Sequence, residues 1–69
     1  MKQIYIIFEG TFFKESYVKA VCTLKKEAAR LCRNNGEYKY NKKEDLYKNE
    51  RENRFRRIDI ETLNPETIW

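Results

Sequence analysis

The sequence contains no histidine and only two cysteines. Histidine is the most common general base and zinc ligand in proteins, so its absence excludes Ser-His-Asp and Cys-His catalysis within one chain. Two cysteines are also too few for a four-cysteine zinc site. These absences remove the commonest routes to hydrolytic and metal-dependent chemistry.

Long apolar runs are missing as well. The chain has no stretch of about 18 apolar residues, so it contains no predicted transmembrane helix. The apolar run that follows Lys2 ends at Glu9 and Gly10, short of a typical signal-peptide core of roughly 7–15 residues. We therefore predict a cytoplasmic protein with no membrane partner.

The spacing of the two cysteines and of the two glycines matches no cofactor-binding motif. Cys22 and Cys32 match neither a C-x-x-C redox pair nor the ligand spacing of a zinc ribbon. We interpret both as small buried hydrophobic residues with free thiols. Gly10 and Gly36 stand alone, so a glycine-rich phosphate loop is excluded. We predict no cofactor, no metal site and no enzymatic activity.

Acidic residues are the remaining source of catalytic or metal-binding chemistry. The six considered for such roles are Glu9, Glu15, Glu44, Asp45, Glu50 and Glu52. Their spacing does not predict a pair of carboxylates in a cleft or a converging set of metal ligands. Lysines neighbour several of them, so we interpret the set as a solvated, ion-paired surface.

The length of 69 residues favours one small domain over residues 1–69. Hydrophobic residues make up 41% of the chain and charged residues 38%, which indicates a folded core beneath a very polar exterior. The net charge is +4, and the basic excess lies in the middle of the chain. We expect a charged insert at about 41–53 and a short C-terminal tail at 64–69.

Alternating β-branched and aromatic residues predict the strands. They lie at about 2–8, 16–22, 37–40 and 54–63. Within the first strand, Tyr5 and Ile7 share one face while Ile4, Ile6 and Phe8 share the other. Both faces are apolar, so we expect this strand to be central.

A helix is predicted at about 24–35, with Thr23 as its N-cap and an end at the Asn34, Asn35 and Gly36 turn. Its apolar residues gather on one face, which should pack on the sheet. The opposite face carries a basic ridge of Lys26, Arg30 and Arg33.

These elements predict an α+β fold, with a small antiparallel sheet of three to four strands and one helix packed on one face. We expect the other face to expose Tyr5, Ile7, Tyr17 and Val21. A second subunit, the 41–53 segment or the tail could cover it, and the small size favours a homodimer or small homo-oligomer. The 41–53 segment itself could be a loop, a short helix or disordered.

Two further surfaces have alternative interpretations. Phe12 and Phe13 could bind a protein partner or close one end of the core. A basic and aromatic set could bind nucleic acid or a nucleotide, or its arginines could protect an edge strand from aggregation. That set comprises Lys26, Arg30, Arg33, Tyr38, Tyr40, Arg54, Arg56 and Arg57.

Four segments, KQIYIIFEG at 2–10, SYVKAV at 16–21, KKEA at 25–28 and RIDIE at 57–61, form a strand, strand, helix and strand pattern. This pattern resembles short uncharacterised proteins encoded by phages and prophages of low-GC bacteria. The resemblance implies an accessory factor in the host cytoplasm that binds and inhibits or modulates a host protein, for example a defence system. It implies no site residues.

Overall fold

The computed structural model describes residues 2–11 and 16–63, which form one helix and a single antiparallel sheet. The predicted α+β class is confirmed, but the sheet has five strands instead of three to four. The elements are β1 (Lys2–Thr11), β2 (Tyr17–Cys22), α1 (Lys25–Arg33), β3 (Lys39–Asn41), β4 (Leu46–Asn49) and β5 (Arg54–Leu63).

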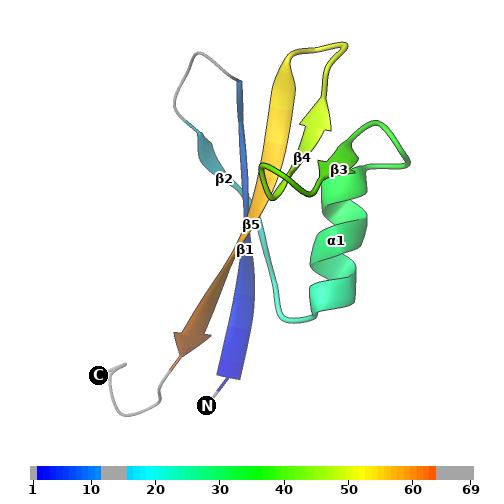
Figure 1. Ribbon diagram of the computed structural model, residues 1–69. Helices are drawn as coiled ribbons and strands as arrows, with labels where there is room; N and C mark the ends of the chain where they lie inside the picture. Colours follow the sequence, from blue (N-terminus) through cyan, green and yellow to red (C-terminus); the bar gives the residue numbers. More distant parts are fainter. Residues whose placement is uncertain (1, 12–15, 64–69) are drawn as a thin grey trace.

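The sheet is built around two long strands, β1 and β5 (Figure 1). The strand order is β2-β1-β5-β4-β3, so β2 and β3 form the two edges. β1 and β5 pair over their full lengths, from Lys2 opposite Leu63 to Thr11 opposite Arg54. The expectation of a central first strand is confirmed, and the strand continues past residue 8 to Thr11.

The strand that the sequence analysis missed is β4, which lies inside the predicted insert at 41–53. Asp45 adopts a left-handed backbone conformation with φ 55°, which closes the turn between β3 and β4. Tyr47 then packs against the hydrophobic core, and β4 pairs with β5. The insert therefore widens the sheet, and its β4 residues do not fold back over the second face.

The core lies between α1 and one face of the sheet, where Ile7, Ala28 and Cys32 have no exposed surface. Tyr5 and Ile58 pack against this cluster. Burial raises the pKa of the Cys32 thiol to about 11, although Arg56 partly opposes that effect, so the thiol stays protonated at neutral pH. Within the described residues both cysteines are free and buried, as predicted.

The core shows which side of β1 the helix covers. Tyr5 and Ile7 lie on the covered side, because Ile7 is in contact with the core beneath α1. The prediction that both residues face away from the helix is therefore wrong. Both sides of β1 are apolar, so the strand pattern alone could not decide which one the helix would select.

The ends of α1 also differ in detail from the prediction. Leu24 occupies the N-cap position and makes no side-chain capping bond, so Thr23 is not the cap. At the other end Asn34 is the left-handed C-cap, with φ 45°, as the asparagine and glycine turn predicted. Leu24 and Leu31 remain 65% and 37% exposed, so they contribute less to the core than the helical periodicity indicated.

Gly10 lies where Ser16, the residue before β2, comes close to β1. A Cβ built on Gly10 would lie 2.9 Å from the Ser16 Cα and 3.3 Å from a Phe55 ring carbon. Because the closest atom is backbone, we expect Gly10→Ala to lower the free energy of unfolding by about 1–3 kcal/mol. Urea denaturation followed by circular dichroism measures this, and an unchanged midpoint would contradict the close approach.

Candidate functional site

The sheet has a second face that α1 does not cover, and the strand registers identify its residues. Ile7 lies on the covered face, and side chains alternate between the two faces along a strand. The even-numbered residues of β1, and the residues paired with them on β2 and β5, therefore lie on the other face. We call this the helix-free face. Its central residues are Ile4, Ile6, Phe8, Val18, Val21, Phe55, Arg57, Asp59 and Glu61, and the registers add Lys2, Gly10, Lys39, Lys48 and Leu63 at its ends and far edge.

Apolar and charged residues occupy separate strands of the helix-free face. On the edge strand β2, Val18 and Val21 are 54% and 58% exposed. Alongside them, β1 contributes only apolar side chains in its central part. The central β5 residues of this face are charged, and there Arg57 bonds Asp59 at 3.1 Å and lies over the ring of Phe8 at 5.0 Å. The face is therefore an apolar stripe flanked by a charged strand.

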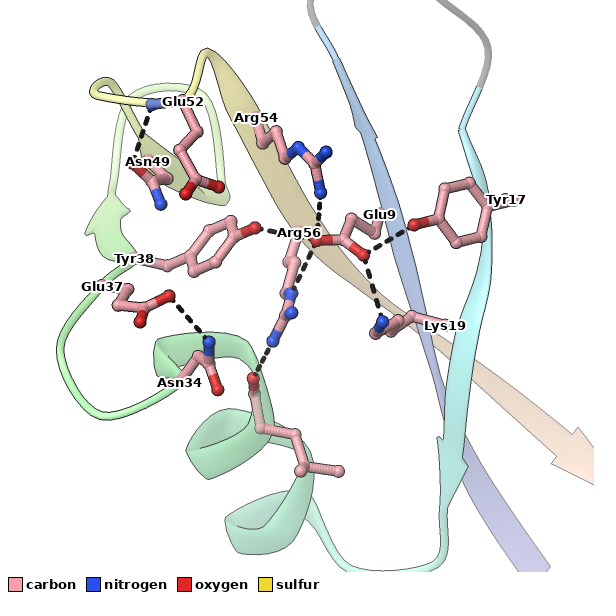
Figure 2. A network of polar contacts seen from close by, with 11 residues as sticks. Glu9, Tyr17, Lys19, Asn34, Glu37, Tyr38, Asn49, Glu52, Arg54 and Arg56 are labelled. Carbon is pink, nitrogen blue, oxygen red and sulfur yellow. Dashed lines mark hydrogen bonds and ion pairs between the residues drawn. The ribbon is translucent and has the colours of Figure 1, made fainter.

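On the opposite side of the sheet, the buried carboxylate of Glu9 lies at the centre of a polar network (Figure 2). Glu9 is 2% exposed, and it accepts hydrogen bonds of 2.8 Å from the hydroxyls of Tyr17 and Tyr38. Lys19 lies 3.6 Å from the second carboxylate oxygen. The network joins β1 to β2 and to the turn after α1.

Arg56 completes the network from β5 and is itself buried. Its Nε donates to Glu9 at 3.3 Å, and one terminal nitrogen donates to the backbone carbonyl of Leu31 at 2.6 Å. The guanidinium also lies 4.5 Å from the centre of the Tyr38 ring. This side chain therefore ties β5 to β1 and to the last turn of α1, as Figure 2 shows.

The charge state of Glu9 follows from these contacts. Burial alone would raise its pKa, but hydrogen bonds from Tyr38 and Tyr17 and the charges of Arg56 and Lys19 outweigh it. The pKa falls from 4.5 to about 2, so the carboxylate holds no proton to donate at neutral pH. Burial and the bond to Glu9 raise the pKa of Tyr38 to about 12. The network is suited to joining elements, and its carboxylate is not suited to acting as a general acid.

Acid should destabilise the fold through Glu9. Because its folded pKa is below the unfolded value, its stabilisation is complete above pH 4.5 and is lost as the pH falls towards 2. We expect a loss of about 3 kcal/mol from this group over that interval. Urea titrations of the wild type at a series of pH values measure it. A free energy of unfolding that stays constant between pH 4.5 and 2 would contradict the assignment.

The location of Glu9 corrects its assignment to the solvated surface. The sequence did carry one relevant pattern: Glu9 continues the alternate positions of Tyr5 and Ile7, and Arg56 continues those of Ile58. Of the other acids, Glu44 is ion-paired with Lys48 and exposed, as expected. Among the described residues no cluster of acids and cysteines could hold a metal ion, and Glu15 lies outside them.

The predicted protein-binding residues are divided between the two faces. Tyr5, Ile7 and Tyr17 lie on the side of the helix, where Ile7 is buried and Tyr17 bonds Glu9. Val21 alone of the expected face lies on the helix-free face. The remaining predictions, Phe12 and Phe13, lie outside the described residues.

The predicted nucleic-acid set is also divided. Arg56 and Tyr38 are buried in the Glu9 network, and Arg54 lies 4.0 Å from Glu9. Arg57 is on the helix-free face, whereas Tyr40 is on the helix side, with its ring centre 5.1 Å from that of Tyr47. The helix ridge of Lys26, Arg30 and Arg33 is exposed, and Arg30 is paired with Glu27. The structure does not bring these residues to one surface.

Comparisons with known proteins add no assignment, since no protein-family model, curated protein or solved structure matches the chain. In the part of the chain that the structure describes, α1 is too short and too polar to cross a membrane.

Proposed function

We propose that this chain is a non-catalytic protein-binding protein that contacts its partner through the helix-free face. One observation carries the proposal: an apolar stripe on β1 and β2 includes Val18 and Val21, each more than half exposed. Contiguous apolar surface on a small protein favours burial against another protein. The adjacent charges of Arg57 and Asp59 would give such a contact orientation and specificity.

The biological role that we propose is that of a phage or mobile-element accessory factor that binds and inhibits or modulates a protein of a bacterial host. This role rests on the resemblance to phage and prophage proteins. A compact protein with a binding face and a separate stabilising network could supply it. Cytoplasmic action is part of the same proposal.

Nucleic-acid binding is the alternative, and the division of its candidate residues weakens it. A basic surface for nucleic acid needs several cations directed at phosphates together with accessible aromatic faces. Arg56 is buried against Glu9, and Tyr38 is 3% exposed, so neither is available for that purpose. The helix ridge would have to supply most of the contacts by itself.

A site-specific crosslinking experiment tests the proposal. A photoreactive amino acid is placed at Val21, on the helix-free face, or at Leu24, an apolar residue of similar exposure at the start of α1. In cells of a low-GC bacterium, we expect Val21 to form protease-sensitive adducts and Leu24 to form few. Absence of protein adducts at Val21 would overturn the proposal.

A nucleic-acid arm separates the two functions. Crosslinked material is treated with nuclease, and the purified protein is titrated with single- and double-stranded oligonucleotides at increasing salt. We expect no binding with a steep salt dependence. Nuclease-sensitive adducts together with an affinity that falls steeply with salt would favour the nucleic-acid function instead.

A further inference from the structure

We infer that the helix-free face binds a second copy of this chain in a two-fold dimer, with the β5 strands of the two protomers running antiparallel across the interface. The inference rests on the proposed function, because it uses the same face: a second copy occupies that face in the free protein, and a host protein would bind there by displacing the copy. It is carried by the order of charges on β5 and by the apolar stripe beside them.

Two neighbouring charges on β5, Arg57 and Asp59, are self-complementary. Arg57 and Asp59 occupy successive positions of the helix-free face and bond each other at 3.1 Å, and Glu61 follows them. If the β5 strand of a second copy runs antiparallel to the first, each Arg57 faces the Asp59 of the other copy. The two opposite charges therefore pair in both directions. A two-fold axis that passes between Arg57 and Asp59, perpendicular to the strands, produces this arrangement.

Close to the axis, the same operation places apolar residues of β1 and β2 against apolar residues, whereas farther out it places Glu61 opposite Phe55. Phe8 lies beside Arg57, and Ile6 lies beside Asp59, in the register of β1 with β5. The operation that exchanges Arg57 and Asp59 therefore sets Phe8 of one copy over Ile6 of the other. On β2, Val18 pairs with Phe8 and Val21 with Ile6, so the two valines face each other across the interface.

Other two-fold arrangements bring unfavourable contacts together. An axis parallel to the strands would place β1 of one copy over β5 of the other, so Phe8 and Ile6 would cover charged residues. Such burial leaves charges without partners. Parallel stacking of β5 on β5 would set Asp59 against Asp59 and Arg57 against Arg57, which is repulsive.

Sheet packing geometry is compatible with the proposed arrangement. Two sheets that pack face to face keep their strand directions within about 30° of each other. Residues close to the axis stay in register at that angle, whereas residues far from it diverge. Arg57 and Asp59 are adjacent to the axis, so their pairing survives the twist of the sheets.

Charge-exchange variants test both the dimer and its direction. We expect wild-type protein to have twice the monomer mass by sedimentation equilibrium. Arg57→Glu and Asp59→Arg should each weaken dimerisation by about 100-fold, because each places like charges opposite each other. An equimolar mixture of the two should form a heterodimer. The double exchange, Arg57→Glu with Asp59→Arg, should dimerise with itself but not with the wild type.

The last result sets the direction of the strands. If β5 stacked in parallel, the double exchange would pair preferentially with the wild type, and this outcome would overturn the antiparallel arrangement. Val21→Lys should be monomeric while keeping its circular dichroism spectrum, and Leu24→Lys, a matched apolar-to-lysine change at 65% exposure, should remain dimeric.

The failures of the two proposals are distinguishable. A monomeric wild type at all concentrations overturns the dimer, and the protein-binding function survives if Val21 still crosslinks another protein in cells. A Val21 position that gives no protein adduct overturns the function as well. Dimers that persist in Val21→Lys would show that a different surface is used, which also overturns the inference.

Discussion

Glu9→Gln is expected to destabilise the protein by about 3–5 kcal/mol, the range for removing one partner of a buried ion pair. Glutamine keeps the size of the side chain but removes its charge. Arg56 then stays buried without a counter-charge, and the hydroxyls of Tyr17 and Tyr38 lose a strong acceptor. Because small domains have total stabilities of about 5 kcal/mol, the variant should retain only about 0–2 kcal/mol of stability at 25 °C.

Thermal and urea denaturation measure the effect, and Glu27→Gln is the matched control. Glu27 is ion-paired with Arg30 on the exposed surface of α1, so its loss should change stability by about 0.5 kcal/mol or less. The double variant Glu9→Gln with Arg56→Gln should lose less stability than the sum of the losses in the two single variants. Each single variant leaves one buried charge without a partner, whereas the double variant leaves none. Equal effects of Glu9→Gln and Glu27→Gln would contradict the importance of the network.

Ile7→Ala is expected to destabilise the protein by about 2–5 kcal/mol. Ile7 has no exposed surface and packs against α1 at the centre of the core. The substitution removes three carbons where neighbouring elements can only partly close the space. Guanidinium denaturation with fluorescence or circular dichroism measures the loss.

Ile60 supplies the control for Ile7, because it is the same residue type on the same face but 55% exposed. Ile60→Ala should therefore cost about 1 kcal/mol or less. If the two variants were equally destabilised, Ile7 would not lie in the core beneath α1. The pair of variants thus tests whether the core on this face is centred at Ile7 and does not extend to Ile60.

The strands and the helix could be predicted from local patterns, because alternation and helical periodicity depend on neighbouring residues. The short strand β4 could not, since Leu46 and Tyr47 form a single apolar pair in a polar segment. That strand exists because it can pair with β5 and bury part of Tyr47, which are properties of the assembled sheet. Local periodicity carries no information on such pairing.

The Glu9 network was beyond local patterns for a related reason. Its partners are separated from Glu9 by 29 residues at Tyr38 and 47 residues at Arg56. A carboxylate followed by Gly10 is typical of a strand end at the surface, and only the register of β1 with β5 shows that Arg56 lies opposite. The choice of the helix-covered face depended in the same way on contacts distant in sequence.

The pairing of β1 with β5 has a consequence for the order in which the chain folds. Their nearest pair, Thr11 with Arg54, encloses a loop of about 40 residues, and closing such a loop precedes most of the sheet's stabilisation. During synthesis β1 emerges early, yet its central partner is made last. Until β5 is made, β1 lacks its longest pairing partner and the apolar residues of its helix-free face stay exposed. Folding dominated by such distant contacts is slow. The interval between the synthesis of β1 and β5 is when this protein is most prone to aggregate.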